Sequence, residues 1–202
     1  MRAWLAKLLL RATISPWLRV SVSGSLPPGP FVLASNHLNW VDPFLFLGWL
    51  PAGRLFVLGR RSAVYDRWWK RVLVDLSGLV VTVEPGHHEL EKVTAEVVPH
   101  LRGRRGLLLF PEGGVEGGVE ASLRPLRSGA VHFALAAGVP LVPAAVCGTA
   151  ELWWGKRARV TVGAPLAAAD LESLTAGIEA LFSPLPEPSG PRRARWLTGL
   201  LR

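Results

Sequence analysis

The sequence of 202 residues contains a single cysteine, Cys147. One thiol can form no disulfide within the chain, and it cannot assemble a cysteine-based metal site by itself. The fold must therefore be held by a hydrophobic core, and a chain of this length that is 50% hydrophobic can bury one. We expect one compact domain. Cys147 lies in an apolar run, which is typical of a buried and unreactive thiol.

Acidic residues are scarce as well, because 15 Asp and Glu stand against 23 Lys and Arg. The formal net charge of +8 indicates an anionic partner, which could be nucleic acid, an acidic cofactor or an anionic membrane surface. Nine tryptophans and a positive mean hydropathy favour the membrane, since indole rings settle among the headgroups and arginines meet lipid phosphate. A nucleic-acid reader should carry a basic stripe interleaved with aromatic residues or a known reader motif, and the sequence has neither. We expect an anionic membrane surface as a partner and no nucleic acid.

The first 20 residues mix large apolar side chains with basic ones. This pattern predicts an amphipathic helix that lies on a membrane surface. A helix packed on the domain is an equal alternative, because amphipathicity alone does not distinguish a protein core from a bilayer. A signal peptide is not favoured, since Lys7 and Arg11 interrupt the apolar stretch and no convincing cleavage site follows.

The stretch between Arg127 and Glu151 contains no Asp, Glu, Lys or Arg and resembles a transmembrane segment in composition. Glycines and prolines punctuate its interior, which predicts a helix through about Ala137, a turn and a buried strand over Leu141–Val146. We therefore expect no membrane-spanning helix. The protein should be peripheral or monotopic, on the cytoplasmic face of the cell membrane.

Short apolar runs recur along the chain and predict strands at Phe31–Ala34, Arg54–Leu58, Leu79–Val83, Gly106–Phe110, Leu141–Val146 and Arg159–Val162. Helical patterns lie between several of them, as over Glu89–Leu101, where Pro99 should kink or shorten the helix. Asp170 is expected to cap another helix. Strands that alternate with helices predict an α/β fold, a single domain with a mixed, mostly parallel sheet covered by helices on both sides.

The first candidate site segment is Ser35-Asn36-His37, which follows a predicted strand, together with Asp42-Pro43, which opens the next apolar stretch. Proline suits the first helical position, so we expect Asp42 at the N-cap and His37 on the loop before it. On one continuous helix this separation would turn the two side chains about 140° apart, so only a loop lets them meet. A carboxylate on one ring nitrogen leaves the other free to accept a proton from an attacking hydroxyl. The pair therefore predicts a general base, although a loop histidine and a helix cap would have the same spacing.

The second candidate segment is the strand end Leu109-Phe110-Pro111-Glu112-Gly113. Proline stops the hydrogen-bonded ladder, and glycine lets a ligand approach the backbone. Glu112 should then be thrust out at the edge where the strands end, which is where ligands bind in open α/β sheets. A plain turn from strand to loop has the same composition.

Together, Asn-His-x-x-x-x-Asp and the later Phe-Pro-Glu-Gly resemble the motifs of the glycerolipid acyltransferase family, in its 1-acylglycerol-3-phosphate acyltransferase branch. The resemblance covers about Leu26 to Val162. It implies transfer of an acyl chain from acyl-CoA or acyl-carrier protein to a lysolipid hydroxyl, without a covalent acyl-enzyme and without a cofactor. With the composition of the two ends, we expect three parts: a membrane-surface helix (1–20), an acyltransferase catalytic domain (21–183) and a Pro-rich linker with a basic amphipathic tail (184–202).

The family's site residues carry over onto matching positions of this sequence. His37 is expected to be the general base and Asp42 its orienting partner, while Asn36 shapes the loop. The expected substrate-binding residues are Asn36, Glu112, Gly113, Arg124 and Arg127. The two arginines are included because they flank the loop of the second motif, and a role as solvated surface charge or bilayer contact is an equal alternative for them.

Two arginines that are usual in the family are missing. Members usually continue Phe-Pro-Glu-Gly with Thr-Arg-Ser, but here Glu116 lies in that stretch, and Glu84 stands where another arginine is usual. A carboxylate about 4 Å from a phosphate would cost on the order of 1 kcal/mol in water and about 4 kcal/mol in a partly buried site. The acceptor is then a lysolipid other than lysophosphatidate, unless another arginine reaches the site from the set Arg60, Arg61, Arg124 and Arg127.

The main alternative is a non-catalytic, membrane-binding relative with the same fold. His37 and Asp42 argue against it, because a degenerate enzyme should lose its base before its substrate specificity. The sequence has no Gly-x-Ser-x-Gly elbow that would supply another nucleophile. The pair His87-His88 lacks a third ligand, so we expect no metal site.

Overall fold

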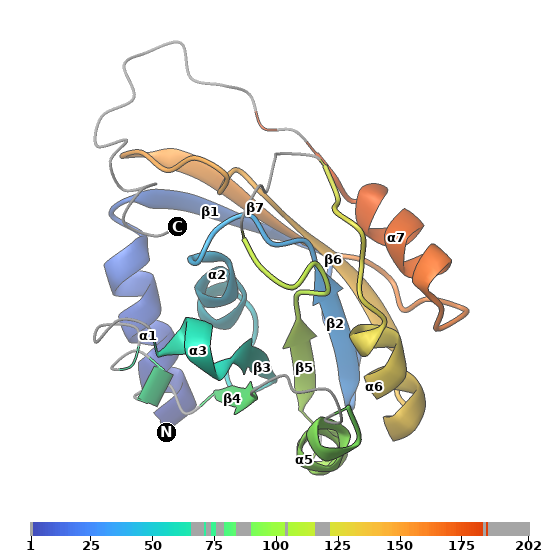
Figure 1. Cartoon of the computed structure of the whole chain (residues 1–202). Helices are drawn as coiled ribbons and strands as arrows, with labels where there is room; N and C mark the ends of the chain where they lie inside the picture. The colour runs from blue at the N-terminus through green and yellow to red at the C-terminus, as the bar shows by residue number, and fades with distance from the viewer. Residues whose placement is uncertain are drawn as a thin grey trace.

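A seven-stranded mixed sheet forms the centre of the protein, in the order β1-β7-β6-β2-β5-β3-β4 (Figure 1). Its strands are β1 Leu18–Ser23, β2 Phe31–Ser35, β3 Leu55–Arg60, β4 Val80–Val83, β5 Gly106–Leu109, β6 Leu141–Cys147 and β7 Lys156–Val162. All neighbours pair in parallel except β6 and β7, which are antiparallel. The predicted mixed, mostly parallel α/β sheet is confirmed.

The computed structural model describes residues 2–65, 71, 74–75, 79–83, 90–103, 105–115, 122–183 and 185. Its helices are α1 Arg2–Ile14, α2 Asp42–Trp49, α3 Arg61–Val64, α5 Leu90–Arg102, α6 Gly129–Ala137 and α7 Leu171–Glu179. The expectations for Glu84, His87-His88, Glu116 and the tail from 186 onward lie outside the described residues.

Helices cover both faces of the sheet (Figure 1). On β2, Phe31 and Leu33 point into the apolar cluster formed with α1 and α2, whereas Val32 and Ala34 point into the cluster formed with α5, α6 and α7. A strand buried on both faces needs a continuous apolar run instead of an alternating one, and Phe31–Ser35 is fully buried. The loop that follows β2 therefore begins in the middle of the sheet, where the parallel strands have their C-terminal ends.

The N-terminal helix is shorter than predicted. It ends at Ile14, and residues 18–20 begin β1, so the expectation of a helix over 1–20 is wrong beyond residue 14. Proline disfavours helical backbone for the residue before it, so Pro16 prevents the helix from continuing through Ser15. The alternating Leu-Arg-Val-Ser-Val-Ser sequence then pairs with β7 as an edge strand.

Helix α1 packs against α2 through one face only. Ala6 and Leu10 are buried, and Gly48 allows close approach, because a Cβ atom there would lie 3.6 Å from Cβ of Leu10. Lys7 Nζ donates to the carbonyl of Leu50 at the C-terminal end of α2, at 2.8 Å. Partial burial, followed by the neighbouring charge of Arg11, lowers the pKa of Lys7. The opposite face of α1 exposes large apolar side chains to solvent.

The remaining helices follow their sequence signals closely. Asp170 is the N-cap of α7, as predicted, and its Oδ1 accepts a hydrogen bond from Ser173 N at 2.7 Å. That hydrogen bond lowers the pKa of Asp170. Helix α5 continues past Pro99 to Arg102, so the proline does not end it. In the described part of the chain, no helix is both long enough and apolar enough to cross a bilayer.

Candidate active site

The loop between β2 and α2 brings His37 and Asp42 together. His37 Nδ1 lies 2.9 Å from Asp42 Oδ2, across five residues of chain. The side chain of Asp42 is fully buried, whereas that of His37 is 13% exposed. A substrate can therefore reach the imidazole but not the carboxylate.

Asp42 occupies a different position from the one predicted. It is the first residue of α2, the N-cap is Val41, and no side chain caps the helix. The expectation of an Asp42 N-cap is wrong by one residue because its carboxylate turns back into the loop. Its Oδ2 atom accepts from the backbone N–H groups of Leu38 and Asn39 at 2.7 and 2.8 Å, in addition to the His37 ring. A negative charge in the first turn is also favoured by the helix dipole.

These contacts determine which tautomer the neutral His37 ring adopts. A carboxylate oxygen can only accept a hydrogen bond, so Nδ1 carries the proton, and we assign Nε2 as the unprotonated nitrogen. The Phe110 ring stacks on the imidazole at a centroid distance of 4.1 Å and an interplanar angle of 22°. Phe46 contacts Phe110 edge-on at 6.1 Å. The ring is thus fixed by a hydrogen bond in its plane and an aromatic contact on its face.

Glu112 is buried, contrary to the expectation that it is thrust out as a wall of the site. Its side chain is 1% exposed. Oε1 accepts from the backbone N–H of His37 at 2.7 Å, and Oε2 accepts from Nε of Arg124 at 2.7 Å. The parallel pairing of β2 with β5 places the loops after both strands side by side, so Glu112 links them. A buried carboxylate needs such partners, because leaving one unpaired costs several kcal/mol.

The two candidate arginines have different surroundings. Arg124 is 28% exposed, and its guanidinium binds Glu112 and the carbonyl of Gly114. Arg127 is exposed, and its guanidinium lies against Gly113, where an added Cβ atom would come within 2.8 Å of its Cζ. Gly113 also has a φ of +82°, which favours glycine. Arg124 therefore neutralises Glu112, while Arg127 presents its charge at the surface of the same turn.

Asn36 does not face a substrate. Its side chain is fully buried, its Nδ2 donates to the carbonyl of Val146 at 2.9 Å, and its Oδ1 accepts from Val146 N at 2.8 Å. The side-chain amide thus continues the β2–β6 ladder one residue beyond the end of β2. The expectation that Asn36 shapes the loop agrees with this geometry, but a substrate-binding role does not.

Sequence reasoning missed the roles of Phe110 and Asn39. Phe110 was expected only as a strand residue, and its signal is its position directly before the proline that ends the strand. Asn39 is fully buried, and its Oδ1 accepts from Val41 N at 3.2 Å.

Cys147 is buried on β6, as predicted. The described residues contain no cluster of three or more His, Cys, Asp or Glu that could hold a metal ion.

Comparison with known proteins gives one family. The family model described as Acyltransferase matches residues 18–147. The chain is 46% identical over 133 residues to the 1-acyl-sn-glycerol-3-phosphate acyltransferase of Escherichia coli strain K12, covering 65% of this chain and 43% of that protein. It is 28% identical over 150 residues to the human 1-acyl-sn-glycerol-3-phosphate acyltransferase alpha, covering 72% and 52%. The chain thus spans about half the length of these curated relatives.

A solved structure shows the same fold. The 1-acyl-sn-glycerophosphate (LPA) acyltransferase from Thermotoga maritima aligns with a TM-score of 0.66, over 89% of this chain and 76% of that chain. The sequence identity is 15%, so the likeness concerns the architecture alone.

Replacing Asn36 by alanine should lower the free energy of unfolding by about 2 to 4 kcal/mol, because the N–H and C=O of Val146 lose their buried partner. Denaturant unfolding followed by tryptophan fluorescence measures the change. Ser35→Ala is the matched control: the residue is equally buried, but its hydroxyl makes only a 3.3 Å contact with Asn36. Equal stabilities of the two variants would contradict the structural role of Asn36.

Proposed function

The chain belongs to the acyltransferase family, and from this premise we propose that it transfers a fatty acyl group from an acyl thioester to a hydroxyl of a lysophospholipid. The observation that carries the proposal is the hydrogen bond between His37 Nδ1 and the buried carboxylate of Asp42. It leaves Nε2 able to accept a proton at the only exposed part of the pair. The donor is proposed to be acyl-CoA or acyl-carrier protein, with no further cofactor.

In the proposed mechanism, His37 Nε2 takes the proton of the acceptor hydroxyl as its oxygen attacks the thioester carbonyl. The ester C–O bond forms, the C–S bond breaks, and the proton passes from the imidazolium to the departing thiolate. Asp42 holds the ring in the required tautomer and stabilises the imidazolium. General-base assistance of this kind contributes about 10²- to 10⁴-fold in rate. Direct attack is supported by the burial of Cys147, which leaves that thiol unsuited to a covalent step.

The acceptor is proposed to be a lysophospholipid of the 1-acyl-sn-glycerol-3-phosphate type. The expectation of an acceptor other than lysophosphatidate rested on the two missing motif arginines, and Glu84 and Glu116, which stand in those two stretches, lie outside the described residues. Two observations support the phosphate-bearing acceptor instead. The charge of Glu112 is offset by Arg124, and the exposed guanidinium of Arg127 lies against Gly113, in the turn that follows Phe110. The relatives are also named for that substrate.

The protein is proposed to act at a membrane surface, with α1 in contact with the lipid. The helix is apolar on two opposite sides: one packs on α2, and the other exposes Trp4, Leu5, Leu8 and Leu9 at 62, 47, 51 and 59%. A helix that faces only water on its outer side should be polar there. The helix packs on the domain, which was one alternative of the sequence analysis, and its outer apolar face supports the proposed bilayer contact, which was the other.

His37→Ala should lower the rate of acyl transfer at least about 100-fold, because it removes the proposed base. The variant keeps the backbone N–H that donates to Glu112, so the loop should stay in place. Steady-state assays with an acyl-CoA and lysophosphatidate measure the loss, and vesicle binding should be unchanged. His100→Ala, at an exposed position on α5, is the matched control. Full turnover by the His37 variant would reject the mechanism. If the unaltered protein binds lipid but transfers no acyl group, the non-catalytic alternative is favoured.

Arg127→Gln should raise the KM for lysophosphatidate about tenfold, because one charge-assisted contact to the phosphate is lost. The KM for a monoacylglycerol, which has no phosphate, should not change. Arg61→Gln is the comparison variant, since Arg61 is exposed and directly follows β3. A KM that responds to Arg61 instead, or a preference of the unaltered protein for neutral or zwitterionic lysolipids, would contradict the assignment.

Leu5→Gln combined with Leu9→Gln should weaken binding to phosphatidylcholine vesicles at least about tenfold, because two apolar side chains no longer favour the bilayer. Co-sedimentation with vesicles measures this. Leu135→Gln removes a leucine that is 64% exposed on α6, and it should leave binding unchanged. An equal effect of both changes would exclude α1 as the membrane contact.

A further inference from the structure

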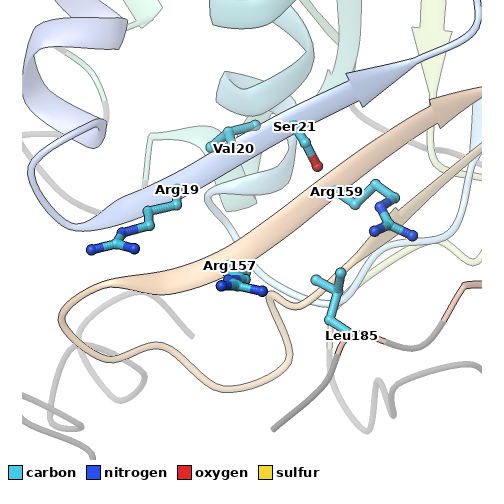
Figure 2. A pocket seen from close by; sticks show the side chains of 6 residues that line it. All are labelled: Arg19, Val20, Ser21, Arg157, Arg159 and Leu185. Atoms are coloured by element: carbon cyan, nitrogen blue, oxygen red, sulfur yellow. The ribbon is translucent and has the colours of Figure 1, made fainter. Parts of the chain in front are cut away.

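A cationic groove lies on the outer side of the β1–β7 pair (Figure 2). The groove has a volume of about 440 Å³. We name it the arginine groove because three of its six lining residues are arginines. The six are Arg19, Val20, Ser21, Arg157, Arg159 and Leu185. None of these six residues is acidic. The groove shares no residue with the site around His37.

The strand register explains why the arginines gather there. Arg19 pairs directly with Arg157, and Ser21 pairs with Arg159. Along β7 the alternate residues Ala158 and Val160 are buried in the core on the side of α1 and α2. The odd-numbered residues of β7, which include Arg157 and Arg159, therefore point to the opposite face of the sheet. On that face α7 packs on β6 and β2.

The charges of the groove are not balanced by described carboxylates. None of the ion pairs among the described residues includes Arg19, Arg157 or Arg159. Arg159 Nη1 donates to the hydroxyl of Ser183 at 2.6 Å, which holds the guanidinium but leaves its charge in place. Like charges directly opposite each other destabilise a pair of strands. An anion bound between Arg19 and Arg157 would remove that cost.

Two tryptophans lie close along the chain to the Arg19–Arg157 pair, where β1 and β7 begin. Trp17 directly precedes β1, and Trp154 precedes β7 by two residues, so both adjoin the Arg19–Arg157 pair. Their rings meet edge-on at 4.6 Å, and Trp154 is 52% exposed. Indole rings settle at the level of the headgroups, where arginines meet phosphate. Helix α1 leads directly into this end of β1 (Figure 1).

We propose that the arginine groove binds the phosphate of an anionic phospholipid headgroup at the membrane surface. Arg19 and Arg157 contact the phosphate, Arg159 and Ser21 line the groove two residues further along the strands, and Trp154 lies among the neighbouring headgroups. This site adds recognition of headgroup charge to the membrane contact of α1 on which it rests. It is independent of the acyl-transfer chemistry.

The test is the double variant Arg19→Gln/Arg157→Gln, assayed on vesicles of phosphatidylcholine with and without phosphatidylglycerol. Affinity for the phosphatidylglycerol vesicles should fall at least about tenfold, and affinity for pure phosphatidylcholine should not change. The matched control is Arg102→Gln/Arg105→Gln, which removes two exposed charges beside the start of β5, three strands away from β7 in the sheet. It should retain binding within about twofold of the unaltered protein.

Acyl transfer to a monodisperse short-chain lysophosphatidate should be the same in both double variants and the unaltered protein. That result shows that they are folded, and it separates failure of this site from failure of the proposed function. An equal loss of vesicle binding in the control would overturn the proposal, because net charge alone would then explain it. The proposal is also overturned if the Arg19/Arg157 variant keeps its vesicle binding but loses affinity for acyl-CoA in the absence of vesicles, since a soluble phosphate would then be the occupant.

Discussion

The Oδ2 atom of Asp42 accepts three N–H groups, from the His37 ring and from the backbone of Leu38 and Asn39. Burying a carboxylate without hydrogen-bond partners is costly, and these donors reduce that cost. The same three contacts close the loop after β2 and orient the imidazole. Because Asp42 is also the first residue of α2, the packing of that helix on α1 and the sheet fixes the position of the carboxylate. The geometry of the site therefore depends on core packing through the position of this one carboxylate.

The parallel sheet supplies the second constraint, since it joins parts of the chain that are distant in sequence. His37 and Glu112 are 75 residues apart, yet β2 and β5 are neighbours and end at the same edge. The hydrogen bond from His37 N to Glu112 then positions the backbone of the base, while Asp42 positions its ring. Arg124 completes this arrangement, because its guanidinium offsets the charge that Glu112 brings into the interior. Each carboxylate near the base is thus held by backbone N–H groups together with a His or Arg side chain.

The sequence predicted the parts of this arrangement that depend on local pattern. Apolar runs predicted six of the strands to within a few residues, and the Asp42-Pro43 signal located the start of α2 to within one. The strand β1 was missed because an edge strand alternates polar and apolar residues and follows a helix without a long linker. The burial of Asn36 and Glu112 could not be predicted, since it depends on which strands are neighbours. Spacing along the chain does not specify strand order.

Charge is distributed so that the interior of the site is close to neutral while the surface stays basic. The charge of Glu112 is paired with that of Arg124, and Oδ2 of Asp42 accepts three N–H groups. The basic residues at the surface include Arg127, in the turn that follows Phe110, and those of the arginine groove at the β1–β7 side of the sheet. Both would attract the anionic acceptor and the anionic bilayer that we propose. Because the two regions are separate, contact with the membrane can be altered without changing the groups proposed to carry out the chemistry.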